Sequence, residues 1–265
     1  MLQANPQYTA VIMAGSRGAA DPVAQASHKS HKCLVEVAGK PMLLRVLETL
    51  ESSPNVRQIV LCIEQSFSRI PWLDERIARG ELIRLDADRS PATSALRACA
   101  KFGDSFPLLI VTADHPLLDI EMLSHFCVNA AHRGDVVVGV ARAELVLSTY
   151  QQSNRTLLRF ADGARCGCNL FALNNSKAIA AVSFWTTLEA ERKRPWRLIR
   201  MLGIGALLRF LTGQLSLSDA LRTLSQKLDI NAQSVEMPFA EAAIDVDNLP
   251  DLELVESILQ NRKPK

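Results

Sequence analysis

Short apolar runs alternate along this chain with amphipathic segments. Runs of β-branched and aliphatic residues predict strands at 9–13, 58–63, 81–85, 107–114, 135–141 and 168–173. Apolar residues at helical spacing predict helices at 41–52, 92–102, 119–131, 175–191, 195–211, 216–227 and 250–260. This alternation of strands with helices predicts an α/β fold.

Strands such as "PLLIVT" at 107–112 are apolar on both faces, so both faces are expected to be buried. Such strands favour a mostly parallel, Rossmann-like sheet covered by helices on each face, which makes three layers. In sheets of this kind, ligands bind beyond the carboxyl ends of the strands. The residues that follow each strand are therefore the first candidates for a functional site.

The composition sets further limits. A chain of 265 residues that is 48% hydrophobic can bury one large core, so we expect one domain over 1–265. The net charge of +2 predicts no nucleic-acid partner and no membrane partner through bulk charge. No basic and apolar leader begins the chain, and no apolar run reaches the roughly 18 to 20 residues of a membrane span. Six cysteines without a Cys-x-x-Cys pair fit a reducing compartment, so we expect a cytoplasmic protein.

The loop after the first strand has the composition of an anion site. Ala14, Gly15, Ser16 and Arg17 follow that strand, and small residues allow backbone N–H groups to turn toward a phosphate that a guanidinium can bind. Lys32 lies at the other end of the same polar loop. The alternative is a Gly-rich turn without a ligand, because "AGSRG" matches neither of the common glycine-rich phosphate motifs.

Carboxylates follow two other predicted strands. Asp114 follows "LLIVT", where it is either a ligand or only a cap for the turn. Asp245 and Asp247 are two positions apart on an expected short strand, so their side chains would share a face. Asp251 falls in the first turn of the last helix, where a carboxylate complements the helix dipole. Carboxylates gathered beside a phosphate loop predict a site for a hard cation, typically Mg²⁺.

Taken in order, these motifs resemble a known family. The chain has a small-residue loop with an Arg, then a Lys before "L-x-x-x-x-G-K-P-M-L", then "D-x-P-L-L" and finally "D-x-D-x-x-x-D-L". This order is similar to that of nucleotidyltransferases with the nucleotide-diphospho-sugar transferase (GT-A-like) fold. It most resembles MobA-like proteins, the molybdenum-cofactor guanylyltransferase-like NTP transferases. The resemblance covers roughly residues 8–125 and 230–260.

The resemblance implies roles for single residues. Gly15, Ser16 and Arg17 would hold the triphosphate of an NTP, and Lys32 would neutralise charge around the α-phosphate. Members of the family usually carry Gly-Gly before the Arg, where this chain has Gly15 and Ser16.

The resemblance also implies a metal and a base or ribose site. Asp114 would be the first ligand of a Mg²⁺ or Mn²⁺ ion, with Asp247 or Asp245 as the second. The start of the predicted helix at 92–102 falls where the family contacts base or ribose, which implicates the residues Ser90, Thr93 and Ser94.

We therefore expect a metal-dependent nucleotidyltransferase. Such an enzyme transfers NMP from an NTP to a small, anionic phosphorylated acceptor or to a hydroxylated one, and it releases pyrophosphate. One alternative is a glycosyltransferase that uses a nucleotide-sugar on the same fold. A second is a protein that binds nucleotide without catalysis, which the missing Gly-Gly would allow. No arrangement typical of a nucleophile triad stands in the sequence.

A helical insertion at about 184–228 lies outside the resemblance. Its 192–209 segment carries six Lys or Arg residues and no acidic residue. One interpretation is weak contact with an anionic membrane surface or with a lipid-like or phosphorylated acceptor. The other is a helical lid with a solvated basic face. Two further pairs, His28 with His31 and Cys166 with Cys168, lack standard zinc spacing and are expected in a solvated loop and a packed turn.

Overall fold

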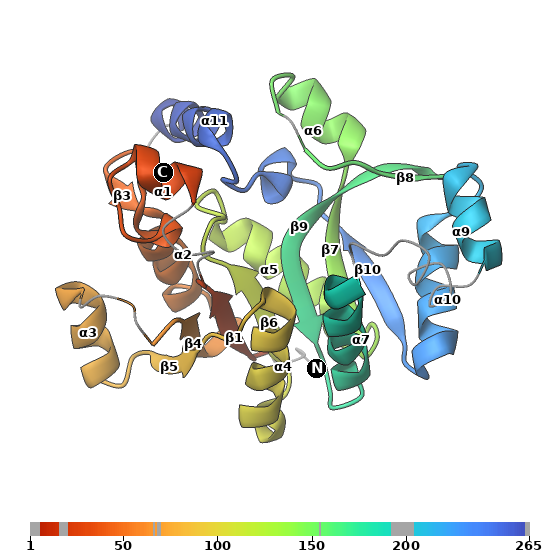
Figure 1. The fold of residues 1–265 in the computed structure, drawn as a ribbon, viewed down its shortest axis with the longest axis horizontal. Coiled ribbons are helices and arrows are strands. Elements are labelled where there is room, and N and C mark those ends of the chain that lie inside the picture. The colour runs from red at the N-terminus through yellow and green to blue at the C-terminus, as the bar shows by residue number, and fades with distance from the viewer. Residues whose placement is uncertain are drawn as a thin grey trace, which may run out of the picture.

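A computed structural model gives the structure of the protein and describes residues 6–15, 21–65, 67, 70–153, 155–191 and 204–262. One sheet runs through the molecule, and helices cover both of its faces (Figure 1). The three-layer α/β architecture predicted from the sequence is confirmed. In the described residues, no helix has the length and apolar character that crossing a membrane requires.

The main sheet has eight strands in the described part of the chain, seven of them in the order β10-β7-β9-β6-β1-β4-β5. Strands pair in parallel except where β9 meets β6, β7 and β8. The sheet is therefore mostly parallel, as predicted. The strands are β1 (Tyr8–Met13), β4 (Val56–Ile63), β5 (Ile83–Asp86), β6 (Leu108–Thr112), β7 (Val136–Arg142), β8 (Leu158–Phe160), β9 (Gly163–Leu173) and β10 (Ala232–Glu236).

The central strands are buried on both faces because they are apolar at almost every position. In β1, Ala10 and Ile12 point into one core cluster, and Val11 between them points into another. Residues of β6 alternate in the same way. The period of two in a strand thus places one apolar set under each helical layer.

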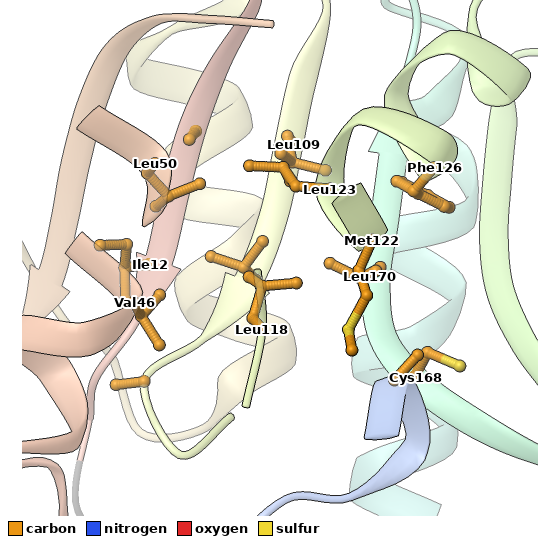
Figure 2. Packing of buried hydrophobic residues seen from close by; sticks show 14 of the residues in the cluster. Ile12, Val46, Leu50, Leu109, Leu118, Met122, Leu123, Phe126, Cys168 and Leu170 are labelled. Atoms are coloured by element: carbon orange, nitrogen blue, oxygen red, sulfur yellow. The ribbon is translucent and has the colours of Figure 1, made fainter. Parts of the chain in front are cut away.

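The first layer contains α2 (Met42–Glu51), α3 (Pro71–Ala78), α5 (Ile120–Ala130) and α6 (Ala143–Thr149). Leu50 of α2 and Phe126 of α5 belong to a single cluster with Leu109 of β6, and Figure 2 shows this packing from close by. These side chains fill the space between the helices and the sheet.

The second layer contains α4 (Pro91–Lys101), α7 (Ala178–Glu191) and α10 (Leu217–Leu228). Trp185 of α7 stacks on Phe171 of β9, with ring centroids 6.2 Å apart. The start of the predicted insertion is therefore part of a helix that covers the sheet. A further helix, α9 (Ile204–Leu211), follows residues 192–203, which lie outside the described residues, as does most of the basic 192–209 segment.

The C-terminal segment returns to the start of the chain. The 3-10 helix η3 (Ala240–Ala243) leads through residues 244–247 to α11 (Leu249–Asn261). Ile244 and Val246 are buried in a third cluster with Val23 of α1 (Pro22–Ala26) and with the small ribbon of β2 (Glu36–Val37) and β3 (Lys40–Pro41). This packing brings the last motif of the sequence beside the first one.

Six predicted strands are found, but one expected strand is wrong. Asp245 and Asp247 do not lie in a strand; they lie in extended chain between η3 and α11. The backbone there forms a single bond to a neighbouring strand end, from the N–H of Val246 to the carbonyl of Asp114, which does not make a ladder. The single-domain boundary stays a prediction.

Candidate active site

The loop after β1 begins at the carboxyl end of the sheet, as predicted. The N–H of Ala14 donates to the carbonyl of Cys62 at 2.9 Å, and Gly15 follows with its backbone exposed. A Cβ atom at Gly15 would lie 3.5 Å from the Cβ of Ala87, so Gly15 faces the residues after β5. Ser16 and Arg17, both predicted to bind phosphate, lie outside the described residues.

Lys32 joins the two ends of the chain. It begins the 3-10 helix η1 (Lys32–Leu34), and its Nζ donates to Oδ2 of Asp114 at 2.7 Å and to Oδ1 of Asp247 at 3.0 Å. Burial lowers the pKa of this ammonium, but the two carboxylates outweigh it and raise the pKa above its ordinary value. Lys32 is therefore a fixed positive charge between two carboxylates, one following β6 and one preceding α11.

Asp114 has one carboxylate oxygen without a hydrogen-bond partner among the described residues. It follows β6, and its backbone carbonyl accepts the N–H of Val246 at 2.9 Å, which fixes the C-terminal segment against this turn. Its Oδ2 accepts from Lys32, whereas its buried Oδ1 has no hydrogen-bond partner among the described residues. An orphaned buried carboxylate oxygen is costly unless another ligand satisfies it.

Asp245 lies deeper than Asp247. Burial, together with the nearby charges of Asp114 and Asp247, raises the pKa of Asp245 to about 6, and Arg155 and Asn169 oppose this rise. The amide of Asn169 donates to Oδ2 of Asp245 at 2.7 Å, and Arg155 binds its Oδ1. This carboxylate is therefore held by two donors in a crowded anionic environment.

Together, the three carboxylates fit a divalent cation. Among the described residues, Asp114, Asp245 and Asp247 form the one group of His, Cys, Asp or Glu with ligand atoms within 4.8 Å of one another. The ligands are all oxygens, which Mg²⁺ and Mn²⁺ prefer. The unpaired, buried Oδ1 of Asp114 and the ion pairs of Lys32 with Asp114 and Asp247 both indicate a place that attracts positive charge.

Ser90, Thr93 and Ser94, which were predicted to contact base or ribose, lie at the start of α4. The side chains of all three form hydrogen bonds with the backbone. The hydroxyl of Ser90 accepts the N–H of Thr93 at 3.2 Å, and the Thr93 hydroxyl accepts the N–H of Ser90 at 3.1 Å, a reciprocal helix cap. Ser94 is buried and accepts the N–H of Asp88 at 2.8 Å. A nucleotide role for these residues stays a prediction.

The sequence did not predict contacts of Arg155 or Asn169 with the carboxylates. Arg155 lies in a polar stretch between two elements that the sequence did not predict, and Asn169 lies inside a predicted strand. Asp251, expected to complement a helix dipole, is buried and accepts the N–H of Asp247 at 3.0 Å. No sequence motif marks Arg155 or Asn169, since their partners are more than 70 positions away.

Neither proposed zinc pair forms a metal group in the described chain. The ring of His31 packs against Phe67, with centroids 4.4 Å apart. Cys166 and Cys168 are buried free thiols in β9, where they belong to the core under the first helical layer. His28 is exposed, in agreement with the expected solvated loop, whereas the expected turn at Cys166 and Cys168 is wrong because both thiols are packed within a strand.

Comparison with known proteins gives one family match. A family model described as MobA-like NTP transferase domain matches residues 10–225. No curated protein matched the chain.

Several solved structures have the same fold. A hypothetical transferase from Thermus thermophilus is 27% identical with a TM-score of 0.76, and the match covers 94% of this chain and 99% of that one. The 4-diphosphocytidyl-2C-methyl-D-erythritol synthase of Anaerococcus prevotii is 13% identical with a TM-score of 0.57, over 97% of both chains. A CMP:2-keto-3-deoxy-manno-octonic acid synthetase in complex with CTP is 11% identical with a TM-score of 0.55, over 96% of this chain and 98% of that one.

Proposed function

Since this chain belongs to the family of MobA-like NTP transferase domains, we propose that it transfers NMP from an NTP to a small acceptor and depends on a divalent metal. The acceptor carries a phosphate or a hydroxyl. One of its oxygens forms a bond to the α-phosphorus, the bond from the α-phosphorus to the bridging oxygen breaks, and pyrophosphate leaves with that oxygen.

The observation that carries the proposal is the bridge made by Lys32. Its ammonium contacts Asp114 and Asp247 and so brings a basic group and two carboxylates to one point at the strand ends. Phosphoryl chemistry needs positioned positive charge more than it needs a strong base. Lys32 would supply such a charge, and the carboxylates would hold a cation that supplies further positive charge.

Each group has a separate part in this mechanism. Asp114, Asp245 and Asp247 would hold the metal, which when bound neutralises charge on the phosphate oxygens. Lys32 would release at least one carboxylate and pair with a phosphate of the bound nucleotide. The exposed backbone at Gly15, next to Ala87, would approach the triphosphate without a side chain in the way.

The acceptor is expected on the opposite side of the carboxylates from β5. Gly15 and the cap of α4 lie on the β4 and β5 side of the sheet, which leaves the β9 side for the second substrate. The solved relatives that transfer cytidylyl groups support a nucleotide donor, and the base is left to experiment.

Pyrophosphate release from a panel of NTPs with Mg²⁺ and candidate acceptors tests the proposal. Asp114→Asn should lower turnover by about 10²-fold or more, because it removes one anionic ligand from the proposed cation site. Asp104→Asn is the matched control, since Asp104 is exposed and precedes β6 at its opposite end. Full activity in Asp114→Asn would remove Asp114 from the site.

The same assay separates the two alternatives. A glycosyltransferase would release a nucleotide from a nucleotide-sugar and give no pyrophosphate from an NTP. A protein that only binds nucleotide would gain thermal stability with an NTP but show no turnover.

A further inference from the structure

One buried guanidinium contacts the C-terminal segment from the far half of the sheet. Arg155 lies between α6 and β8, and only 6% of its side chain is exposed. Its Nη1 donates to Oδ1 of Asp245 and, at 3.0 Å, to the backbone carbonyl of the same residue. Its Nη2 donates to Oδ1 of Asp251. Arg155 thus holds two carboxylates, of which only Asp245 belongs to the metal group.

Asp251 extends this contact to the other C-terminal carboxylate. Its Oδ2 accepts the backbone N–H of Asp247 at 3.0 Å, so the position of Asp247 depends on the carboxylate that Arg155 holds. Asp251 is itself fixed, because its N–H donates to the side chain of Asn248, which caps α11. The chain of contacts runs from Arg155 through Asp251 to Asp247.

Asn169 completes the set from β9. Its backbone has φ 52°, a left-handed conformation that Asn and Gly tolerate better than other residues. This turn of the chain directs its amide to Oδ2 of Asp245 at 2.7 Å. Each oxygen of Asp245 therefore has one donor, and a carboxylate with about four acceptor sites keeps room for a cation.

We propose that Arg155 is a positioning residue that orients Asp245 and Asp247 so that both can hold a divalent cation together with Asp114. Nη1 of Arg155 contacts Oδ1 of Asp245 directly. Nη2 contacts Asp251, whose other carboxylate oxygen accepts the backbone N–H of Asp247, so Arg155 acts on Asp247 only indirectly. Partners that orient metal ligands from behind typically change metal affinity by about 10- to 100-fold when they are removed. This proposal rests on the proposed metal-dependent function.

The alternative is that Arg155 only stabilises the fold by pairing with buried carboxylates. If this role is purely structural, replacing Arg155 should lower the melting temperature of the protein. The cation affinity of the folded variant should then equal that of the wild type. The experiment must therefore measure cation binding directly, apart from turnover.

We would titrate the full chain with Mn²⁺ alone and follow free Mn²⁺ by electron paramagnetic resonance. Arg155→Met is expected to weaken Mn²⁺ binding by about 10- to 100-fold, and Arg155→Lys to recover part of the loss. Arg159→Met is the matched control, because Arg159 is exposed on β8 only four positions away, and it should bind as the wild type does. Wild-type affinity in a folded Arg155→Met variant, or no binding by the wild type, overturns the proposal.

A second variant decides the matter if Arg155→Met does not fold. Asn169→Gly suits the left-handed backbone and removes only the amide that holds Asp245. We expect about a 10-fold loss of Mn²⁺ affinity with an unchanged circular dichroism spectrum. Unchanged Mn²⁺ affinity in this variant, alongside a loss in Asp245→Asn, would mean that orientation of Asp245 does not matter and would overturn the proposal.

The two proposals fail in different ways. Binding of Mn²⁺ that depends on Arg155, without pyrophosphate release from any NTP, would contradict the proposed function and leave the positioning role standing. Pyrophosphate release that is lost in Asp114→Asn but kept in Arg155→Met would support the proposed function and contradict the positioning role of Arg155.

Discussion

At the level of single residues, the carboxylates of the site differ in how far their side chains are exposed to solvent. Asp247 has 63% of its side chain exposed, whereas 19% of the Asp245 side chain is exposed. Burial together with the charges of Asp114 and Asp247 raises the pKa of Asp245 to about 6. The deeper carboxylate is therefore the one that gains a proton first as the solution becomes acidic.

This difference predicts a pH dependence of cation binding. Below pH 6, a cation has to displace a proton from Asp245, so affinity should fall by about tenfold per pH unit. Above about pH 7 the carboxylate is already ionised and the affinity should level off. Mn²⁺ titration between pH 5 and 8 measures this change, and Asp245→Asn should remove the step. Affinity in the wild type that is constant over this range would contradict a role for Asp245 as a ligand.

At the level of elements, the sequence predicted those parts whose signal is local. β6 is apolar throughout and ends at a carboxylate, so both the strand and the place of Asp114 could be predicted. Asp245 and Asp247 were expected in a strand because Ile244 and Val246 alternate with them. Those apolar residues instead pack against the start of the chain, a tertiary contact that no local pattern encodes. β10 was missed because its five residues AQSVE carry little apolar pattern.

Helix α4 allows a test at the same scale. Ser90→Ala should reduce the free energy of unfolding by about 1 kcal/mol, because the first turn of α4 loses its cap. Ser90→Asn should keep most of the stability, since Asn caps helices as well as Ser. Urea unfolding measures both variants. The KM for the NTP then tests the predicted nucleotide contact, and an unchanged KM in both variants would exclude Ser90 from it.

At the level of the whole molecule, the site joins two parts of the sheet. Asp114 follows β6 and Lys32 follows the loop after β1, while Asn169 and Arg155 come from β9 and the segment before β8. Parallel pairing changes to antiparallel where β6 meets β9 (Figure 1). The chain passes from β1 to β4 and β5 on one side and then to β6 on the other, so the strand order reverses between β1 and β6. Asp114 follows β6 at this point, which is where open α/β sheets bind ligands.

A ligand that contacts both parts should stabilise the entire fold. With an NTP and Mg²⁺ at about 100 times the Kd, we expect roughly 2.7 kcal/mol of added stability. This corresponds to a rise in Tm of about 5 to 10 °C for a chain of this size. Differential scanning fluorimetry with and without Mg²⁺ measures the rise, and Asp114→Asn should lose most of it. The same Tm rise without Mg²⁺ would mean that the nucleotide binds without the cation.

The ammonium of Lys32, seated between Asp114 and Asp247, has a consequence for the order in which substrates arrive. A bare divalent ion has to compete with a positive charge that is covalently tethered and always present at high effective concentration. A metal–nucleotide complex brings its own phosphate. The ammonium of Lys32 can pair with this phosphate while Asp114 and Asp247 bind the metal in place of Lys32. A divalent ion alone should therefore bind measurably but more weakly than the same ion in complex with a nucleotide. Free Mg²⁺ in excess should be a poor inhibitor, and the productive encounter should be with the metal and nucleotide as one complex.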